Sequence, residues 1–356
     1  MWAQLLITGL LVALLPLSVV WASKDVSKYR KLIAVTLFLT FDLIVFGAFT
    51  RLTDSGLGCP DWPGCYGEAN PFQSHEAIKT AQDLMPTGPV TLLKAWVEMI
   101  HRYLAMSVGV LIVAQMLIAW WQRRKLQHSP WLPTALFFCV GVQGAFGAWT
   151  VTMKLQPIIV TIHLLLGMIL LALLAWSFAR ELTSSPNSSN GLKPEQSGLI
   201  RIATIALILL GVQIALGGWV STNYAALACN DYPLCNGVFA PEMDFVHGFT
   251  LWRKLGQQAN GDYLPFSALV AIQWVHRSFA WCAIGAVVWA AFLARKTPTL
   301  SSLANKILLV IFAQLVTGVA TVFFSWPLLI AVLHNAGAAL LVLLLTMLNY
   351  RARHAA

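Results

Sequence analysis

The sequence contains little charge. Only 10% of its 356 residues are Asp, Glu, Lys or Arg, whereas 58% are hydrophobic. Soluble domains carry roughly 25% charged residues, so this composition excludes an ordinary soluble domain. Apolar runs close to the ~20 residues that a membrane-spanning helix needs follow one another along the chain. The sequence therefore predicts an all-α polytopic membrane protein, with spans at 2–22, 32–50, 95–121, 131–152, 157–179, 199–220, 268–293, 304–324 and 328–349.

Basic residues are missing before the first apolar run, 2–22, where a cleaved signal peptide would carry them. They follow this run instead, at Lys24, Lys28, Arg30 and Lys31. This order favours a retained helix whose N-terminus lies outside. A cleaved segment is the alternative, and it would leave the orientation of the other spans unchanged.

Acidic residues are scarce in one set of hydrophilic segments, which holds 15 Lys+Arg and 3 Asp+Glu. The opposite set holds 6 Lys+Arg and 9 Asp+Glu. Loops rich in Lys and Arg stay in the cytoplasm, so the C-terminus is predicted to be cytoplasmic and the long loops 51–94 and 221–266 to lie outside. The net charge of +9 therefore reflects orientation in a lipid membrane, and no nucleic-acid partner is expected.

Several landmarks recur at nearly one spacing, which indicates an internal duplication. They are Cys59 and Cys65 with Cys229 and Cys235 (170 residues apart), His101-Arg102 with His276-Arg277 (175), and His163 with His334 (171). We predict two pseudo-symmetric four-helix transmembrane bundles, 32–182 and 199–350, joined by a cytoplasmic linker, 183–198. An extra helix with a basic turn, 1–31, precedes them. An even number of helices per bundle makes the repeats parallel.

Four histidines lie inside predicted spans, roughly 8–13 Å below the outer boundary at a rise of ~1.5 Å per residue. Ionisable residues at such depth face a cavity or a bundle interior. A single one is as often a packing residue, but two helices in each half presenting histidine at matching depth favour axial ligation of heme iron. Zinc fits less well, because its usual three or four ligands are not clustered. The four are His101, His163, His276 and His334.

A carboxylate distinguishes the first histidine pair from the second. Glu98 lies one helical turn before His101, whereas Gln273 stands at the matching place before His276. This difference indicates divided work, with proton handling in the first half and electron carriage in the second. A structural role for Glu98, as a partner of a neighbouring arginine or imidazole, is the alternative. Asp42 has no counterpart and is left unassigned.

Polar residues around the histidines suggest two further features. Arg102 and Arg277 each follow a histidine and are candidates for contacts with heme propionates, or for snorkelling at the membrane surface. The cysteines of each outer loop are separated by five residues, a spacing that allows a disulfide in an oxidising compartment. Structural staples are the default interpretation of these pairs, and redox exchange is the alternative.

These motifs resemble the heme A synthase family, over about residues 32–349. The run from Gly47 to Cys65 is similar to the family's first outer loop. The other matching segments are Glu98-Met99-Ile100-His101-Arg102, Asn230-Asp231-Tyr232-Pro233-Leu234-Cys235, His276-Arg277 and Leu333-His334-Asn335.

The resemblance implies oxidation of the C8 methyl group of heme O to the formyl group of heme A, by two hydroxylations and loss of water. His101 and His163 would hold the substrate heme, with Glu98 as the catalytic carboxylate. His276 and His334 would ligate a resident heme b. The paired cysteines would stabilise the loops over the sites or take part in redox transfer.

The resemblance also implies a place in the cell and a set of partners. We expect a bacterial inner-membrane protein with its cysteine loops in the periplasm. Its partners would be heme O, heme A, a heme O synthase and cytochrome oxidase assembly factors. Three other functions are weighed against this one: a di-heme b-type cytochrome that only passes electrons, a transporter, and a thiol–disulfide oxidoreductase.

Overall fold

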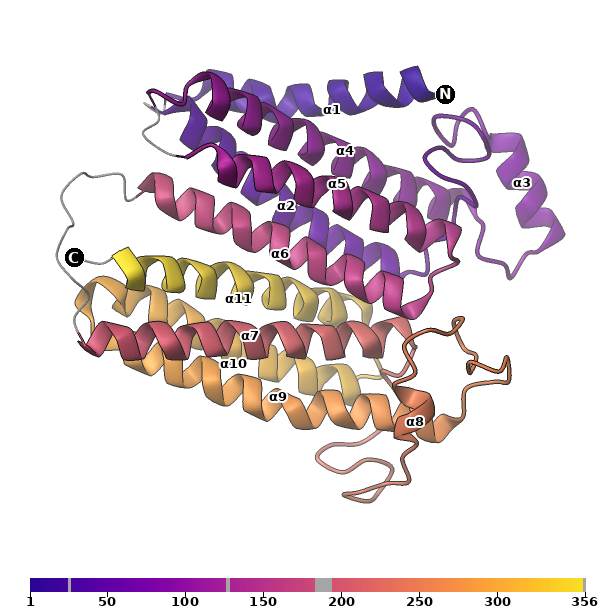
Figure 1. Ribbon diagram of the computed structural model, residues 1–356. Helices are drawn as coiled ribbons and strands as arrows, with labels where there is room; N and C mark the ends of the chain where they lie inside the picture. Colours follow the sequence, from indigo (N-terminus) through magenta and orange to yellow (C-terminus); the bar gives the residue numbers. More distant parts are fainter. Residues whose placement is uncertain (25–26, 126–128, 183–193, 355–356) are drawn as a thin grey trace. The chain divides into compact units, whose positions relative to one another are not determined.

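The computed structural model of the protein describes residues 1–24, 27–125, 129–182 and 194–354 (Figure 1). The regular elements of these ranges are helices. They are α1 (Trp2–Ala22), α2 (Lys28–Leu52), α3 (His75–Leu84), α4 (Leu92–Trp121), α5 (Trp131–Thr152), α6 (Pro157–Leu182), α7 (Pro194–Thr222), α8 (Phe245–Gly248), α9 (Phe266–Arg295), α10 (Pro298–Phe323) and α11 (Leu328–His354).

All of these helices except α3 and α8 are long and apolar enough to cross a membrane, which makes nine candidate spans in the described part of the chain. Each predicted span falls on one of them. The prediction of an all-α polytopic membrane protein is therefore confirmed, and the chain is a multi-pass membrane protein. Most of the predicted linker, 183–193, lies outside the described residues, and α7 begins at Pro194.

Local sequence signals explain where several helices begin and end. The side chains of Ser27 and Thr91 accept hydrogen bonds from backbone N–H groups in the first turns of α2 and α4, as N-capping residues do. Pro298 stands at the start of α10, where its missing N–H costs nothing. Residues with positive φ follow α2, α5, α7 and α10 at positions related by the repeat, namely Asp54, Lys154, Tyr224 and Ser325. A left-handed residue of this kind ends a helix.

The chain divides into two compact units. Unit 1 comprises Met1–Leu155 and Ile169–Phe178, and unit 2 comprises Gln156–Met168 and Ala179–Ala356. Helix α6 therefore contributes its first part to unit 2 and a later part to unit 1.

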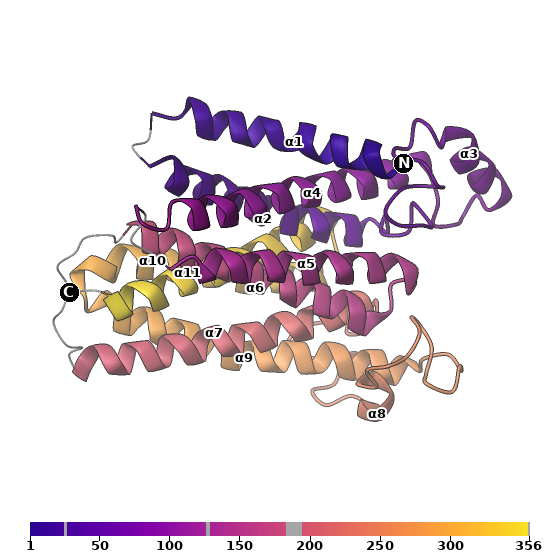
Figure 2. The same ribbon diagram turned by 45° about the horizontal axis from the view of Figure 1, so that its top comes forward.

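Helix α4 is the centre of unit 1, since α1, α2 and α5 all pack against it. In both views α1 runs beside α4 (Figures 1 and 2). A buried cluster of Val20, Leu32 and Leu111 joins α1, α2 and α4. Gln115 of α4 donates a 2.7 Å hydrogen bond to the Thr36 hydroxyl of α2, which gives its amide nitrogen a partner that lipid could not supply.

Unit 2 contains a closed ring of helices, in which α7 packs on α9, α9 on α10, α10 on α11 and α11 on α7. Near the end of α11, Asn349 accepts a 2.8 Å hydrogen bond from Thr204 of α7 and donates one of 3.0 Å to the Ala203 carbonyl. This polar contact joins the first and last helices of the ring.

Candidate functional site

Two of the predicted ligands lie in one pocket of unit 2. His276 of α9 and His334 of α11 both line it, and the space free of protein atoms amounts to about 1360 Å³ with open solvent included. The rest of the wall is largely apolar, for example Leu210, Ile284 and Val319. An apolar pocket with a few convergent polar groups is the usual form of a ligand or cofactor site.

Glycines make room for the imidazoles. A Cβ atom on Gly217 of α7 would lie 2.9 Å from Cε1 of His276, and one on Gly318 of α10 would lie 3.1 Å from Cε1 of His334. Both distances are shorter than ordinary van der Waals contact, so a larger residue would displace the ring. The same arrangement occurs in unit 1, where a Cβ on Gly47 of α2 would lie 3.0 Å from Nε2 of His101.

Each imidazole of the unit 2 pocket meets a polar side chain through its Nδ1 atom. The Thr317 hydroxyl lies 2.9 Å from Nδ1 of His334. The Gln213 amide nitrogen lies 3.2 Å from Nδ1 of His276 and donates to the backbone carbonyl of that residue. These contacts fix the two rings from the helices next to their own.

Arg277 retains a donor at the pocket wall. Its Nη2 donates to the carbonyl oxygens of Asp231 (2.8 Å) and Leu234 (3.0 Å), and the guanidinium lies 5.1 Å from the centre of the Tyr232 ring. Its Nη1 is buried and has no hydrogen-bond partner within the described structure. A buried guanidinium nitrogen in this state is ready to bind an anionic group.

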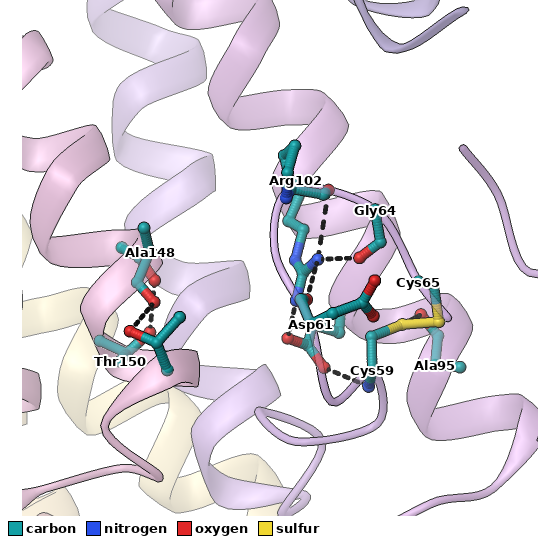
Figure 3. A network of polar contacts seen from close by, with 12 residues as sticks. Cys59, Asp61, Gly64, Cys65, Ala95, Arg102, Ala148 and Thr150 are labelled. Carbon is teal, nitrogen blue, oxygen red and sulfur yellow. Dashed lines mark hydrogen bonds and ion pairs between the residues drawn. A yellow bond between two sulfur atoms is a disulfide. The ribbon is translucent and has the colours of Figure 1, made fainter. Parts of the chain in front are cut away.

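The equivalent arginine of unit 1 is engaged differently. Nη1 of Arg102 donates to the carbonyl oxygens of Asp61 (3.0 Å), Pro63 (3.2 Å) and Gly64. Its Nη2 donates to Oε1 of Glu98. Figure 3 shows the guanidinium enclosed by the loop that bears the disulfide. Both terminal nitrogens of Arg102 are thus bound to the protein. This contact matches the alternative raised from the sequence, in which Glu98 is a structural partner of a neighbouring arginine.

Glu98 connects this loop to α4. Its side chain is buried, with 4% of the residue exposed, and its Oε2 accepts a 2.9 Å hydrogen bond from the backbone N–H of Cys59. Gln273, at the matching place in unit 2, instead donates a 3.1 Å hydrogen bond to the Ala226 carbonyl. Its Oε1 is buried without a partner in the described part of the chain.

The disulfide-bearing loops of the two units share their internal structure. The carboxylate of Asp61 accepts from the N–H groups of Tyr66 (2.6 Å) and Gly67 (2.7 Å). Asp231 does the same with the two residues that follow Cys235, at 2.6 Å and 2.9 Å. The repeat that was inferred from spacing therefore extends to matching hydrogen bonds.

The predicted disulfides are present, Cys59–Cys65 with a Cα–Cα distance of 4.9 Å and Cys229–Cys235 with 4.6 Å. All four cysteines are buried. Exchange with an external thiol requires access to a sulfur atom, so their burial favours the structural interpretation of the pairs.

The two remaining predicted ligands lie in different units. His101 is half-buried on α4 of unit 1, with its ring stacked 6.2 Å from that of Phe46. His163 lies on α6, in the part that belongs to unit 2. Their pairing around one heme stays a prediction.

The donors that the structure brings together suit heme better than zinc. Among the described residues, no three His, Cys, Asp or Glu side chains are grouped so that they could hold a metal ion. Unit 2 instead offers two imidazoles, glycines beside both rings and a spare guanidinium donor. These features are typical of a membrane protein that binds heme between transmembrane helices.

The comparison with known proteins agrees with this class. The COX15-CtaA family model, described as cytochrome oxidase assembly protein, matches residues 30–346. The chain belongs to this family. Helix α1 precedes the matched region.

Curated relatives are similar over nearly their whole length. A heme A synthase of Shewanella oneidensis is 38% identical over 327 residues, which cover 90% of this chain and 95% of the relative. A heme A synthase of Caulobacter vibrioides is 30% identical over 346 residues, covering 90% and 96%. A third, of Rhizorhabdus wittichii, is 28% identical over 324 residues.

Sequence reasoning missed the neighbours of the imidazoles. The glycines were detectable, because Gly47 and Gly217 are separated by 170 residues, the same offset as the cysteines. Gln213 and Thr317 gave no such signal, since the repeat places Leu43 and Phe146 at their positions.

Proposed function

We propose that the protein is a heme A synthase, which oxidises the C8 methyl group of heme O to the formyl group of heme A. The observation that carries the proposal is the family match over residues 30–346, together with curated heme A synthases similar over nearly their whole length. The pocket of unit 2, with His276 and His334 in its wall, supports it independently.

We assign the resident heme, of b type, to unit 2. His276 and His334 would be its axial ligands, and Arg277 would bind a propionate through Nη1. When bound, this heme supplies one-electron chemistry. The protein's part is to hold the two rings apart beside Gly217 and Gly318 and to surround them with apolar side chains.

We assign the substrate heme to the first half of the repeat. His101 and His163 would ligate it, because they are the sequence equivalents of His276 and His334. The contact of His101 with Gly47, which matches that of His276 with Gly217, supports the assignment of His101.

Glu98 would receive protons in this half. Oxidation of a methyl group to a formyl group releases protons as well as electrons, and a carboxylate one turn from a heme ligand is placed to accept them. Its carboxylate accepts hydrogen bonds from Cys59 and Arg102 and from the backbone of Gly58, whereas two carboxylate oxygens offer about four lone-pair sites. The loop would therefore hold the carboxylate still without occupying all of its acceptor sites.

We propose that the outer loops face the periplasm and that the C-terminus is cytoplasmic, following the charge bias of the loops. A heme O synthase would deliver the substrate, and cytochrome oxidase assembly factors would receive the product. The bundle boundaries predicted at 32–182 and 199–350 belong to the same proposal.

Heme extraction and chromatography test the assignment. The full-length protein is produced in cells with and without a heme O supply, as wild type and as the Glu98→Gln and Gln273→Glu variants. The Glu98→Gln protein is expected to form heme A at least about 100-fold more slowly, the lower end for loss of a general base, while it keeps heme b. Gln273→Glu is the matched control and should still form heme A.

Two results would contradict the proposal at different levels. Heme A formation at the wild-type rate by Glu98→Gln would remove the role of that carboxylate. Wild-type protein with heme b at both sites and no heme A, despite a heme O supply, would instead indicate the di-heme cytochrome.

A further inference from the structure

We propose that Thr317 and Gln213 are positioning residues for the two ligands of the resident heme. They bind Nδ1 of His334 and His276, and this leaves Nε2 of each ring as the nitrogen for iron. The proposal rests on the assignment of that heme to unit 2, and it concerns residues whose side chains have no polar counterpart in the first half.

Thr317 defines the proton on His334. Its hydroxyl lies 2.9 Å from the Ala313 carbonyl, one turn earlier in α10, and 2.9 Å from Nδ1 of His334. A hydroxyl has one proton to donate. Since the Ala313 carbonyl can only accept that proton, the oxygen of Thr317 is left to accept from Nδ1–H. An imidazole with its proton on Nδ1 has its free lone pair on Nε2, the form that ligates a metal.

Gln213 performs the same task for His276 after rotation of its amide. Its Nε2 faces Nδ1 of His276 at 3.2 Å, while its Oε1 is buried without a partner in the described structure. A carboxamide turned by 180° fills the same space. The turned amide gives up its hydrogen bond to the His276 carbonyl, an oxygen that also lies within the backbone hydrogen-bond ladder of α9. In exchange it places Oε1 opposite Nδ1–H, which gives the buried oxygen a donor and leaves Nε2 of the ring for iron.

The two anchors come from helices other than those of the ligands. Thr317 lies on α10 and holds a ring of α11, and Gln213 lies on α7 and holds a ring of α9. Each ring is also confined by a glycine of the anchoring helix, Gly318 or Gly217. The orientation of each ligand thus depends on the packing of two helices, which suits a cofactor that stays in place.

The sequence equivalents of the anchors are apolar. Leu43 matches Gln213 and Phe146 matches Thr317, and neither side chain contains a hydrogen-bonding group. Side-chain hydrogen bonds of the unit 2 type are therefore not available from these two positions of the first half. We infer that they serve retention and electronic tuning of the resident heme, a requirement that a substrate heme does not share.

The test uses the purified full-length protein with its heme. Thr317→Val removes the hydroxyl at nearly constant size, Thr317→Ser keeps it, and Gln213→Leu introduces the residue of the first half. Thr204→Val is the matched control, because it removes a hydroxyl of the same unit at the contact with Asn349. The measurements are the rate of heme transfer to excess apomyoglobin, the midpoint potential of the heme and its low-spin electron paramagnetic resonance spectrum.

Thr317→Val and Gln213→Leu are each expected to lose heme about 10-fold faster, the lower end of the effect of removing a hydrogen-bonded partner of a ligating histidine. The potential should rise, because an imidazole that no longer donates from Nδ1 is a weaker base toward ferric iron. Thr317→Ser and Thr204→Val should retain the wild-type potential and spectrum.

Wild-type transfer rates, potentials and spectra in both Thr317→Val and Gln213→Leu would overturn the proposal. Equal changes in the Val and Ser variants of Thr317 would do so as well, because they would indicate a packing effect of the methyl group. If the assignment of the resident heme to unit 2 is itself wrong, the result is distinguishable, because a His276→Ala protein would still carry its full complement of heme b.

Discussion

The two disulfide loops, one in each unit, have the same structure but different neighbours. In both units an arginine donates to the carbonyls at equivalent positions of the disulfide loop, Asp61 and Gly64 in unit 1 and Asp231 and Leu234 in unit 2. In unit 1 the arginine also meets the buried Glu98. In unit 2 no carboxylate takes that place, and Nη1 of Arg277 stays unpaired among the described residues.

This difference shows how a duplicated scaffold can serve two purposes. The loop, its disulfide and its arginine are common structural parts, whereas the residue one turn before the histidine decides whether the arginine meets a carboxylate. A buried carboxylate suits proton transfer, and a spare cationic donor suits retention of an anionic cofactor.

The largest expected effect comes from the arginines themselves. Arg102→Ala leaves the Glu98 carboxylate buried without its cation, and removing one partner of a buried ion pair costs about 3–5 kcal/mol. Arg277→Ala loses hydrogen bonds but strands no charge, so we expect a loss of about 1.5–3 kcal/mol. Chemical unfolding in detergent measures both losses.

A double variant sharpens this test. Glu98→Gln should recover part of the stability lost in Arg102→Ala, because it removes the unpaired charge. Equal losses for the two arginines, or no recovery in the double variant, would show that the ion pair does not distinguish the units.

The next effect concerns α1, which supports the loop of unit 1. Leu5 is 3% exposed and belongs to a cluster with Cys59, Cys65 and Met99, and the Trp2 ring lies 6.4 Å from that of Trp62. Leu5→Ala should cost about 2 kcal/mol, the lower end for a buried leucine. We also expect faster reduction of Cys59–Cys65 by a phosphine.

The control for this change is on the same helix. Leu6 is 63% exposed, so Leu6→Ala should leave the reduction rate unchanged. Mass spectrometry after alkylation follows both disulfides, and Cys229–Cys235 should react as in the wild type. Faster reduction of both disulfides would indicate general loosening and would contradict a local role of α1.

The smallest effect belongs to the long loop between α7 and α9 in unit 2. Hydrogen bonds from the backbone and ring of His247 hold the pKa of the Asp244 carboxyl below its usual range. A depressed folded-state pKa stabilises the protein above the unfolded value of about 3.8, and this stabilisation is lost as the pH falls through the folded value.

The wild type should therefore have a slightly higher unfolding temperature than Asp244→Asn at pH 5. The two unfolding temperatures should converge as the pH falls below 3.8. The pair is partly exposed to solvent, so the difference is expected to be small. If the difference in unfolding temperature between the two proteins widened as the pH fell, the inferred direction of the Asp244 pKa shift would be wrong.

Composition and the spacing of a few residue types were sufficient to predict the membrane helices and the repeat. Low charge and long apolar runs leave a helix as the structure that satisfies its own backbone in lipid, so the spans followed from composition. Cysteine and histidine spacing then revealed the duplication, and the disulfide partners followed because short loops offer few alternatives.

Tertiary structure decided which polar groups meet. Nothing in the spacing of Arg102 indicated that the loop carbonyls would take up its donors, because that contact depends on the path of a loop about 40 residues away in sequence. The same holds for Thr317 and Gln213, which reach their histidines across helix interfaces. The sequence determined that four histidines lie in the membrane, and in unit 2 helix packing decided which of their nitrogens are held and which are left for a ligand.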